Sequence, residues 1–148
     1  MSDLQVWCVG NVLLGDDAVG CRVAELLAER GVPAADCGTV PENYIPALSK
    51  NPPRALLIVD AADMGLPPGE CRKLSLKELG AGAAADSSHG VPLPLLLSPF
   101  EGRFEIAVLG IQPASFRLGA PLSDAAEKAA LRAADLISKD EWRGVAPL

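Results

Sequence analysis

The stretch GNVLLGDDAVG, residues 10–20, combines a glycine-framed turn with two adjacent carboxylates. Its spacing from Gly10 to Gly15 is that of a phosphate-binding loop, but Asp16 and Asp17 stand where such a loop has Lys and then Ser or Thr. Carboxylates at a helix start repel a phosphate and favour a cation. One acid is enough to cap the helix, so we interpret Asp16 as the cap and Asp17 as the functional acid.

Two further groups able to do chemistry occur later in the chain. Asp60 ends the apolar run RALLIVD, and His89 is the only histidine. Each has an ordinary structural explanation, since an acid after a strand accepts backbone N–H groups in the next turn and a lone loop histidine is usually exposed. With Asp17, however, they would form a set of two carboxylates and one imidazole that suits nickel, zinc or iron(II). The spacing permits this convergence but does not prove it.

Nucleophilic catalysis has weak support in this sequence, because there is no G-x-S-x-G nucleophile elbow. The four cysteines, at positions 8, 21, 37 and 71, have no CxxC spacing, which disfavours structural zinc and is typical of buried thiols in a reducing cytosol. We interpret Cys37, the most loop-like of them, as a small turn residue rather than a nucleophile. A nucleotide-binding alternative, with Asp36 as the ribose acid, lacks the GxGxxG fingerprint.

Composition places the chain among ordinary globular proteins. It has 148 residues, of which 49% are hydrophobic and 22% charged, with a formal net charge of −6. This length predicts one domain over residues 1–148, and the acidic charge disfavours a nucleic-acid surface. The longest apolar runs fall far short of the roughly 20 residues of a membrane span, and no basic signal-peptide region precedes them. We therefore expect a cytoplasmic protein.

Strand and helix patterns alternate along the chain and must position these residues. Strands are predicted at residues 4–10, 32–38, 54–63, 69–76 and 103–110, the 69–76 segment as an alternating edge strand. Helices are predicted at 18–31, near Glu42 and at 122–140, where Asp124 and Glu127 resemble a capping box. Residues 79–88 are predicted to form a loop. This order favours an α/β sandwich with a mainly parallel sheet, in which sites form at the carboxyl ends of the strands.

Five stretches of the chain form a more specific pattern. They are VWCVGNVLLGDDAVG, DCGTVPENY, RALLIVDAADMGLPPGECR, SSHGVPL and VLGIQP. In this order they resemble the hydrogenase maturation proteases, most closely the type that processes the large subunit of hydrogenase-3-type nickel–iron hydrogenases. The resemblance spans about Leu4 to Pro113 and implies a three-layer α/β/α sandwich. Its twisted, mostly parallel sheet would have five strands, with one antiparallel strand at an edge.

The resemblance also implies an activity. Members of the family are endopeptidases that remove a C-terminal extension from the large-subunit precursor after nickel insertion. Their metal ligands fall on Asp17, Asp60 and His89, and either carboxylate would be the candidate catalytic base. The nickel would come with the precursor, and no organic cofactor is implied. We expect a monomer whose partner is the nickel-loaded precursor, while a non-catalytic metal-binding module with the same ligands is the alternative.

The functional loop of the family falls on Asp36, Cys37 and Gly38, which become candidate substrate-binding residues. Two positions depart from the family pattern. Cys37 stands where a second glycine is common, and Ala18 stands where glycine is usual. If position 18 needs a positive φ, Ala18 strains the turn; if it is simply the first helical turn, Ala18 is harmless or better.

Overall fold

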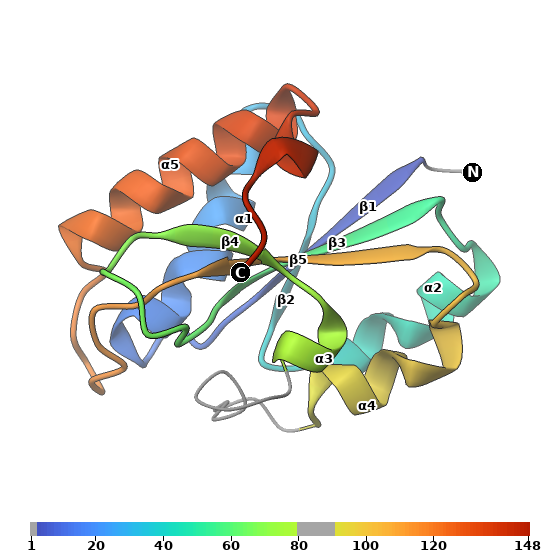
Figure 1. The fold of residues 1–148 in the computed structure, drawn as a ribbon, viewed down its shortest axis with the longest axis horizontal. Helices are drawn as coiled ribbons and strands as arrows, with labels where there is room; N and C mark the ends of the chain where they lie inside the picture. Colours follow the sequence, from blue (N-terminus) through green and yellow to red (C-terminus); the bar gives the residue numbers. More distant parts are fainter. Residues whose placement is uncertain (1–2, 80–90) are drawn as a thin grey trace.

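The computed structural model describes residues 3–79 and 91–148 (Figure 1). Within these ranges the strands form one sheet of five, in the order β2-β1-β3-β5-β4. Their bounds are Leu4–Val9 for β1, Ala35–Gly38 for β2, Ala55–Ala61 for β3, Cys71–Leu74 for β4 and Glu105–Ile111 for β5. Four strands are parallel, and β4 pairs antiparallel with β5 at one edge. The expected sheet is confirmed.

Helices cover both faces of this sheet, which confirms the α/β/α sandwich (Figure 1). Helices α1 (Val19–Glu29) and α5 (Asp124–Ser138) lie together on one face. The shorter helices α2 (Ile45–Lys50), α3 (Leu76–Leu79) and α4 (Leu93–Leu97) lie on the other. The 3-10 turns are η1 (Gly15–Ala18), η2 (Pro41–Tyr44), η4 (Ser98–Phe100) and η5 (Trp142–Gly144). Among the described residues, none of the helices is long and apolar enough to cross a bilayer.

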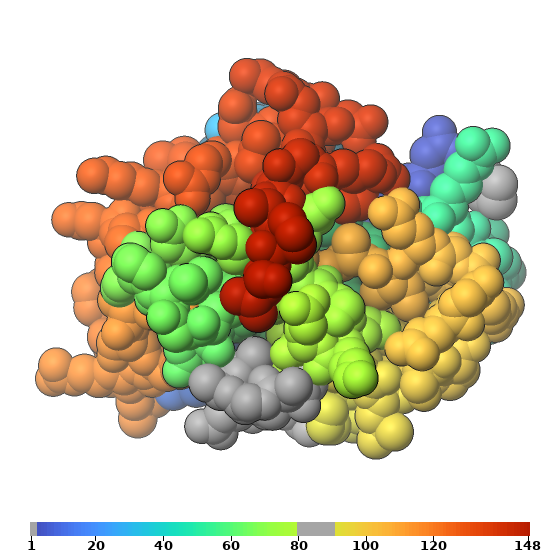
Figure 2. Space-filling model, viewed as in Figure 1, coloured from blue at the N-terminus to red at the C-terminus, as the bar shows by residue number. Residues whose placement is uncertain are grey.

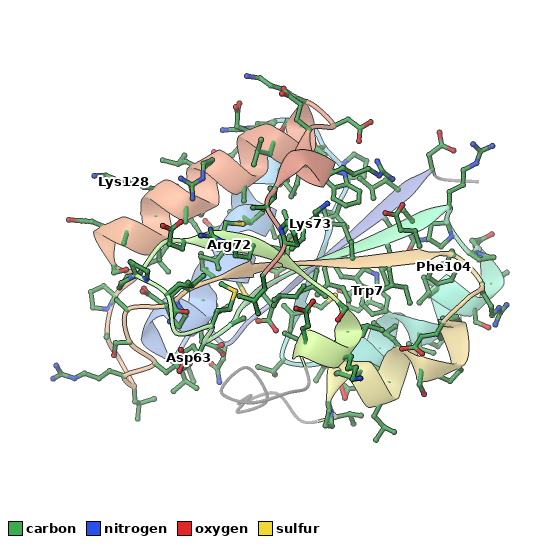
Figure 3. All side chains as sticks on the ribbon, in the orientation of Figure 1. Trp7, Asp63, Arg72, Lys73, Phe104 and Lys128 are labelled. Atoms are coloured by element: carbon green, nitrogen blue, oxygen red, sulfur yellow. The ribbon has the colours of Figure 1, made fainter. Side chains whose placement is uncertain are left out.

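Strand β3 is buried along its whole length because its continuous apolar run is covered on both sides. Leu57 and Val59 face the core under α1 and α5. Leu56 and Ile58 face the second core, which also contains Trp7 between the sheet and the layer of shorter helices (Figure 3). The alternation shows that one uninterrupted hydrophobic segment supplies both cores.

The N-cap of helix α5 lies one residue before the position that the capping-box pattern suggests. The N-cap is Ser123, whose hydroxyl accepts the N–H of Ala126 at 3.1 Å, so the capping box expected from Asp124 and Glu127 is wrong. Glu127 instead accepts a hydrogen bond from Arg22 Nε of α1 at 2.9 Å. The buried alanine face of α5 lets the two helices pack closely, and this ion pair joins them at the surface.

The backbone conformation of Ala18, directly before α1, shows whether this position needs glycine. This residue has φ −76° and ψ −4°, ordinary right-handed helical values, so no glycine is needed there. The helix ends at Glu29, and Gly31 follows with φ +70°, the conformation expected of a C-terminal glycine cap. The loop predicted at 79–88 lies outside the described residues, except for Leu79, which ends α3.

Candidate active site

The first turn of α1 lies directly against the ends of two central strands. A Cβ at Gly20 would overlap the carbonyl oxygens of Val9 in β1 and Val59 in β3, so only glycine fits. Gly10 has a similar role, because a Cβ there would overlap the carbonyl oxygen of Asp17. These two contacts hold η1, with its acids, at the carboxyl ends of β1 and β3.

Asp17 is 5% exposed at this position. Its Oδ2 accepts the backbone N–H of Asn11 at 3.1 Å, and its own N–H donates to the carbonyl of Leu14 at 2.9 Å. The carboxylate is therefore fixed by the loop that joins β1 to η1. A buried carboxyl group that accepts a backbone N–H is held in one orientation.

Asp60 is 3% exposed and lies near the end of β3, in register with Gly110 of β5. The thiol of Cys21, in the first turn of α1, is close to both candidate acids. Burial is the largest cause that raises the pKa of this thiol to about 12; the charge and hydrogen bonding of Asp36 add to it, followed by the charges of Asp17 and Asp60. The thiol donates a hydrogen bond to the carbonyl of Gly10 at 3.5 Å, and the charges of all three candidate acids act on it.

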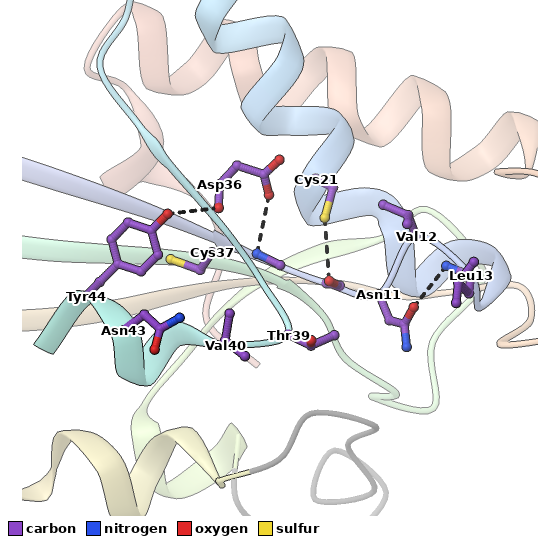
Figure 4. A pocket seen from close by; sticks show the side chains of 12 residues that line it. Asn11, Val12, Leu13, Cys21, Asp36, Cys37, Thr39, Val40, Asn43 and Tyr44 are labelled. Carbon is purple, nitrogen blue, oxygen red and sulfur yellow. Dashed lines mark hydrogen bonds between the residues drawn. The ribbon is translucent and has the colours of Figure 1, made fainter.

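A pocket of about 420 Å³, lined in part by Cys21, opens between the end of β2 and the loop after β1 (Figure 4). Asp36, Cys37 and Gly38 line one side, and Asn11 and Leu13 line another. The carbonyl of Asp36 accepts the hydroxyl of Tyr44 at 3.2 Å, and its carboxylate weakly accepts the N–H of Gly38 at 3.4 Å. The predicted substrate-binding residues are therefore together in one concave site.

Cys37 differs from the expectation of a partly buried turn residue, because it lies in β2 and is buried. Burial, and then the charge of Asp36, raise the pKa of its thiol to about 12. A neutral buried thiol is a poor nucleophile, in agreement with the weak sequence support for covalent catalysis. Gly38 has φ +53°, whereas Cys37 has no positive φ, so the second glycine of the family pattern is not required at position 37.

Asp16 is a structural acid, but it does not cap the helix that follows it. Its carboxylate accepts the N–H of Ala114 at 2.8 Å, the N–H of Ser123 at 2.8 Å and the hydroxyl of Ser123 at 2.6 Å. The capping prediction is wrong because a more distant segment, between β5 and α5, supplies these donors. Asp16 therefore ties that segment to η1 and leaves Asp17 as the acid that lies beside Cys21.

His89 lies outside the described residues, so its predicted place beside the two acids stays a prediction. Over residues 3–79 and 91–148, no group of three or more His, Cys, Asp or Glu side chains has an arrangement that could hold a metal ion. The two buried carboxylates are donors suited to a divalent cation, and a third ligand would have to come from elsewhere.

Gln112 is a buried residue whose role the sequence reasoning missed. Its Oε1 accepts the N–H groups of Met64 at 2.6 Å and Leu66 at 3.3 Å, and its Nε2 donates to Asp63 at 3.1 Å. These bonds brace the turn that follows Asp60. The signal was present in the sequence, since a glutamine directly after the apolar strand EIAVLGI needs internal partners if it is buried.

Comparison with known proteins agrees with this geometry. A family model described as hydrogenase maturation protease matches residues 21–140. The hydrogenase 3 maturation protease of Escherichia coli K12 is 38% identical over 128 residues, covering 81% of each chain. The solution structure of the endopeptidase HycI from Escherichia coli superimposes with a TM-score of 0.87 at 32% identity, covering 100% of this chain and 97% of the other.

A second solved structure supports the same assignment. The crystal structure of the [NiFe] hydrogenase maturation protease HycI from Thermococcus kodakarensis has a TM-score of 0.81 at 32% identity. It covers 95% of this chain, and this chain covers 93% of it. The likeness thus extends over the sheet, both helical layers and the segments that carry Asp17 and Asp60. The chain belongs to the family of hydrogenase maturation proteases.

Proposed function

We propose that the chain is an endopeptidase that removes the C-terminal extension of a nickel–iron hydrogenase large-subunit precursor after nickel insertion. The observation that carries this proposal is the pair of buried carboxylates, Asp17 and Asp60, beside an open pocket at the strand ends. Membership of the family supports the reaction class. The neutral state of the Cys37 thiol supports a mechanism without a covalent intermediate.

Recognition begins with the nickel of the precursor. Asp17 and Asp60, joined by His89, are the side chains that would bind it, since two carboxylates and an imidazole suit a borderline divalent ion. A precursor without nickel has no cation to offset the charge of these carboxylates. Binding through the nickel fixes the nearby peptide against the enzyme, and such positioning is worth several powers of ten in rate.

The peptide bond is then hydrolysed by water. One of the two carboxylates, Asp17 or Asp60, accepts a proton as the water oxygen bonds to the peptide carbonyl carbon. The same carboxyl group returns the proton to the amide nitrogen as the carbon–nitrogen bond breaks. The products are a shortened large subunit with a new carboxylate and a released peptide with a new amine.

The pocket lined by Asp36, Cys37 and Gly38 is where the peptide next to the cut would lie. The positive φ of Gly38 and the bond from Tyr44 to the carbonyl of Asp36 shape the loop at its mouth. We assign these residues to substrate binding rather than to the chemical step, because Asp36 is exposed whereas Asp17 and Asp60 are buried, and the raised pKa keeps the Cys37 thiol neutral.

Incubation with nickel-loaded and nickel-free precursor, followed by intact-mass measurement, tests the proposal. The wild-type chain should shorten only the loaded precursor, and Asp17→Asn, Asp60→Asn and His89→Ala should each lose at least a hundredfold in rate. Asp124→Asn, an exposed acid at the start of α5, is the matched control and should retain full activity.

Two results would count against the proposal. Full activity of Asp17→Asn would exclude the carboxylate mechanism. Nickel binding by the wild-type chain, without shortening of either precursor, would instead support a non-catalytic metal-binding module that uses the same ligands.

A further inference from the structure

Two loops far apart in the sequence lie side by side next to the candidate active site. Leu14 and Leu118 form an antiparallel bridge, and the N–H of Gly119 donates to the carbonyl of Leu13 at 2.8 Å. Gly15, which follows Leu14, has φ +53°. It approaches the backbone of residues 115–117 so closely that a Cβ at this position would lie 2.7 Å from the carbonyl oxygen of Ser115. The three hydrogen bonds to Asp16 hold the second loop in place.

This double loop exposes an unusual set of apolar side chains. Leu118 is 73% exposed, Val12 68%, Leu13 61% and Phe116 38%. We call these four residues the apolar ridge. In Figure 2 the segment after β5 projects from the molecule at the lower left. Single exposed apolar residues are ordinary, but several gathered on two mutually fixed loops are typical of an interaction surface.

The ridge also carries a positive charge. Arg117 is exposed between Phe116 and Leu118, and among the described residues no carboxylate pairs with its guanidinium. The two acids on the facing loop, Asp16 and Asp17, are buried, and their carboxylates accept backbone N–H groups. An apolar surface around one cation is complementary to a partner with apolar residues and a carboxylate.

A second copy of this chain fits the ridge poorly. A two-fold symmetric contact through these loops would place one Arg117 near the other, and like charges at an interface are unfavourable. The ridge is instead continuous with the candidate active site, because Val12 and Leu13 also line the pocket beside Asp36. A protein that reaches this pocket from the side of Val12 and Leu13 therefore contacts the ridge.

We infer that the apolar ridge and Arg117 are the docking surface for the hydrogenase large-subunit precursor, through an apolar face of that subunit that carries a carboxylate. The inference rests on the proposed function for the identity of the partner. Docking on the ridge holds the folded part of the precursor while its extension lies in the pocket. The short loop from Gly10 to Asp17 takes part in both events, since Asn11 binds the carboxylate of Asp17.

Charge reversal and apolar-to-acidic substitution test the inference. Arg117→Glu and Leu118→Asp should each weaken binding of the nickel-loaded precursor, and raise KM, by about tenfold or more, with kcat unchanged. Lys50→Glu, at the end of α2, and Leu131→Asp, on the exposed face of α5, are the matched controls and should leave both values unchanged. Binding is compared by calorimetry among proteins that all carry Asp17→Asn, so that cleavage is blocked and the loss of this nickel ligand is common to every variant. KM and kcat are measured by intact mass in otherwise wild-type protein, and folding by circular dichroism.

The outcomes separate this inference from the proposed function. If the ridge variants weaken precursor binding but the wild-type chain does not cleave the precursor, the docking surface is supported and the protease proposal is overturned. Cleavage by the wild-type chain with unchanged binding and KM in both ridge variants would overturn the docking surface alone. If the wild-type chain sediments as a dimer and Leu118→Asp converts it to a monomer, the ridge is a self-association surface and the inference is overturned.

Discussion

The carboxylate of Asp16 accepts a 2.6 Å hydrogen bond from the hydroxyl of Ser123, the N-cap of α5, across a sequence separation of 107 residues. The same hydroxyl oxygen accepts the N–H of Ala126. One acid at the start of α1 therefore orients the residue that caps the neighbouring helix. The two helices are joined both through this bond and through Arg22 and Glu127.

Substitution of Asp16 should be costly for stability. Asp16→Ala leaves the N–H groups of Ala114 and Ser123 without their acceptor, and we expect it to lower the free energy of unfolding by about 3 kcal/mol. Ser123→Ala should cost about 1–2 kcal/mol through loss of the cap. Urea unfolding of both single variants and the double variant measures the coupling. If the losses of unfolding free energy in the two single variants simply add in the double variant, the bond between the two side chains contributes nothing to stability.

Exchange of glycine and alanine should destabilise the chain much more at position 20 than at position 18. Gly20→Ala forces a Cβ against the carbonyls of Val9 and Val59, so we expect it to cost about 3 kcal/mol or more and to lower activity by displacing η1. Ala18→Gly only adds backbone freedom to an ordinary helical position and should cost about 0.5–1 kcal/mol with no change in kcat. Thermal unfolding and the processing assay check both. A stable, active Gly20→Ala protein would contradict the close contact.

Gln112 should act on the site through the turn after Asp60. Gln112→Leu removes the acceptor of the Met64 and Leu66 N–H groups, and we expect about 2 kcal/mol lower stability and a reduced kcat. Gln112→Glu keeps the acceptor but puts a carboxylate beside Asp63, so the turn should again loosen. Hydrogen exchange at residues 62–66 is the direct measurement. Unchanged protection of these amides in Gln112→Leu would contradict the role.

The raised thiol pKa values predict loss of stability at alkaline pH. Cys21 and Cys37 shift from the ordinary value of 9.0 to about 12, so the unfolded chain loses these protons at a lower pH than the native chain. Their contribution is complete below pH 9 and is lost as pH rises from 9 towards 12. Urea unfolding at several pH values should show this slope, and it should be shallower in the Cys21→Ala, Cys37→Ala double variant.

Thiol reagents test the same groups through their reactivity. At pH 7.5 iodoacetamide should modify the native chain far more slowly than the urea-unfolded chain, and cleavage should persist, because the thiols are neutral and buried. Rapid inactivation that bound precursor prevents would contradict this expectation and assign a catalytic role to Cys37.

Much of the architecture could be predicted because local signals agreed with the tertiary structure. The apolar run of β3 predicted the centre of the sheet, and the glycine-framed turn from Gly10 to Gly15 predicted the position of η1. The placement of η1 against the ends of β1 and β3 also followed, since parallel strands bring their carboxyl ends to one edge of the sheet. Family resemblance supplied the reaction class, which these local patterns could not identify.

The errors arose where a distant segment competes for a side chain. The sequence near Asp16 suggests a helix cap, but the donors come from residues 114–123, which nothing local indicates. The capping box at α5 failed for a related reason, because Glu127 is used by Arg22 of another helix. Gln112 was missed because its partners follow a different strand. Side-chain partners separated by many residues are the information that local patterns lack.

The long separation between Asp16 and its donors has a consequence for synthesis of the chain. Asp16 leaves the ribosome 98 residues before Ala114 and 107 residues before Ser123. Until they emerge, burial of Asp16 would place a carboxylate without its hydrogen bonds in the core. Asp16 therefore reaches its final arrangement only after residues 114–123 have emerged, so a nascent chain that lacks them does not yet hold η1 in its final position.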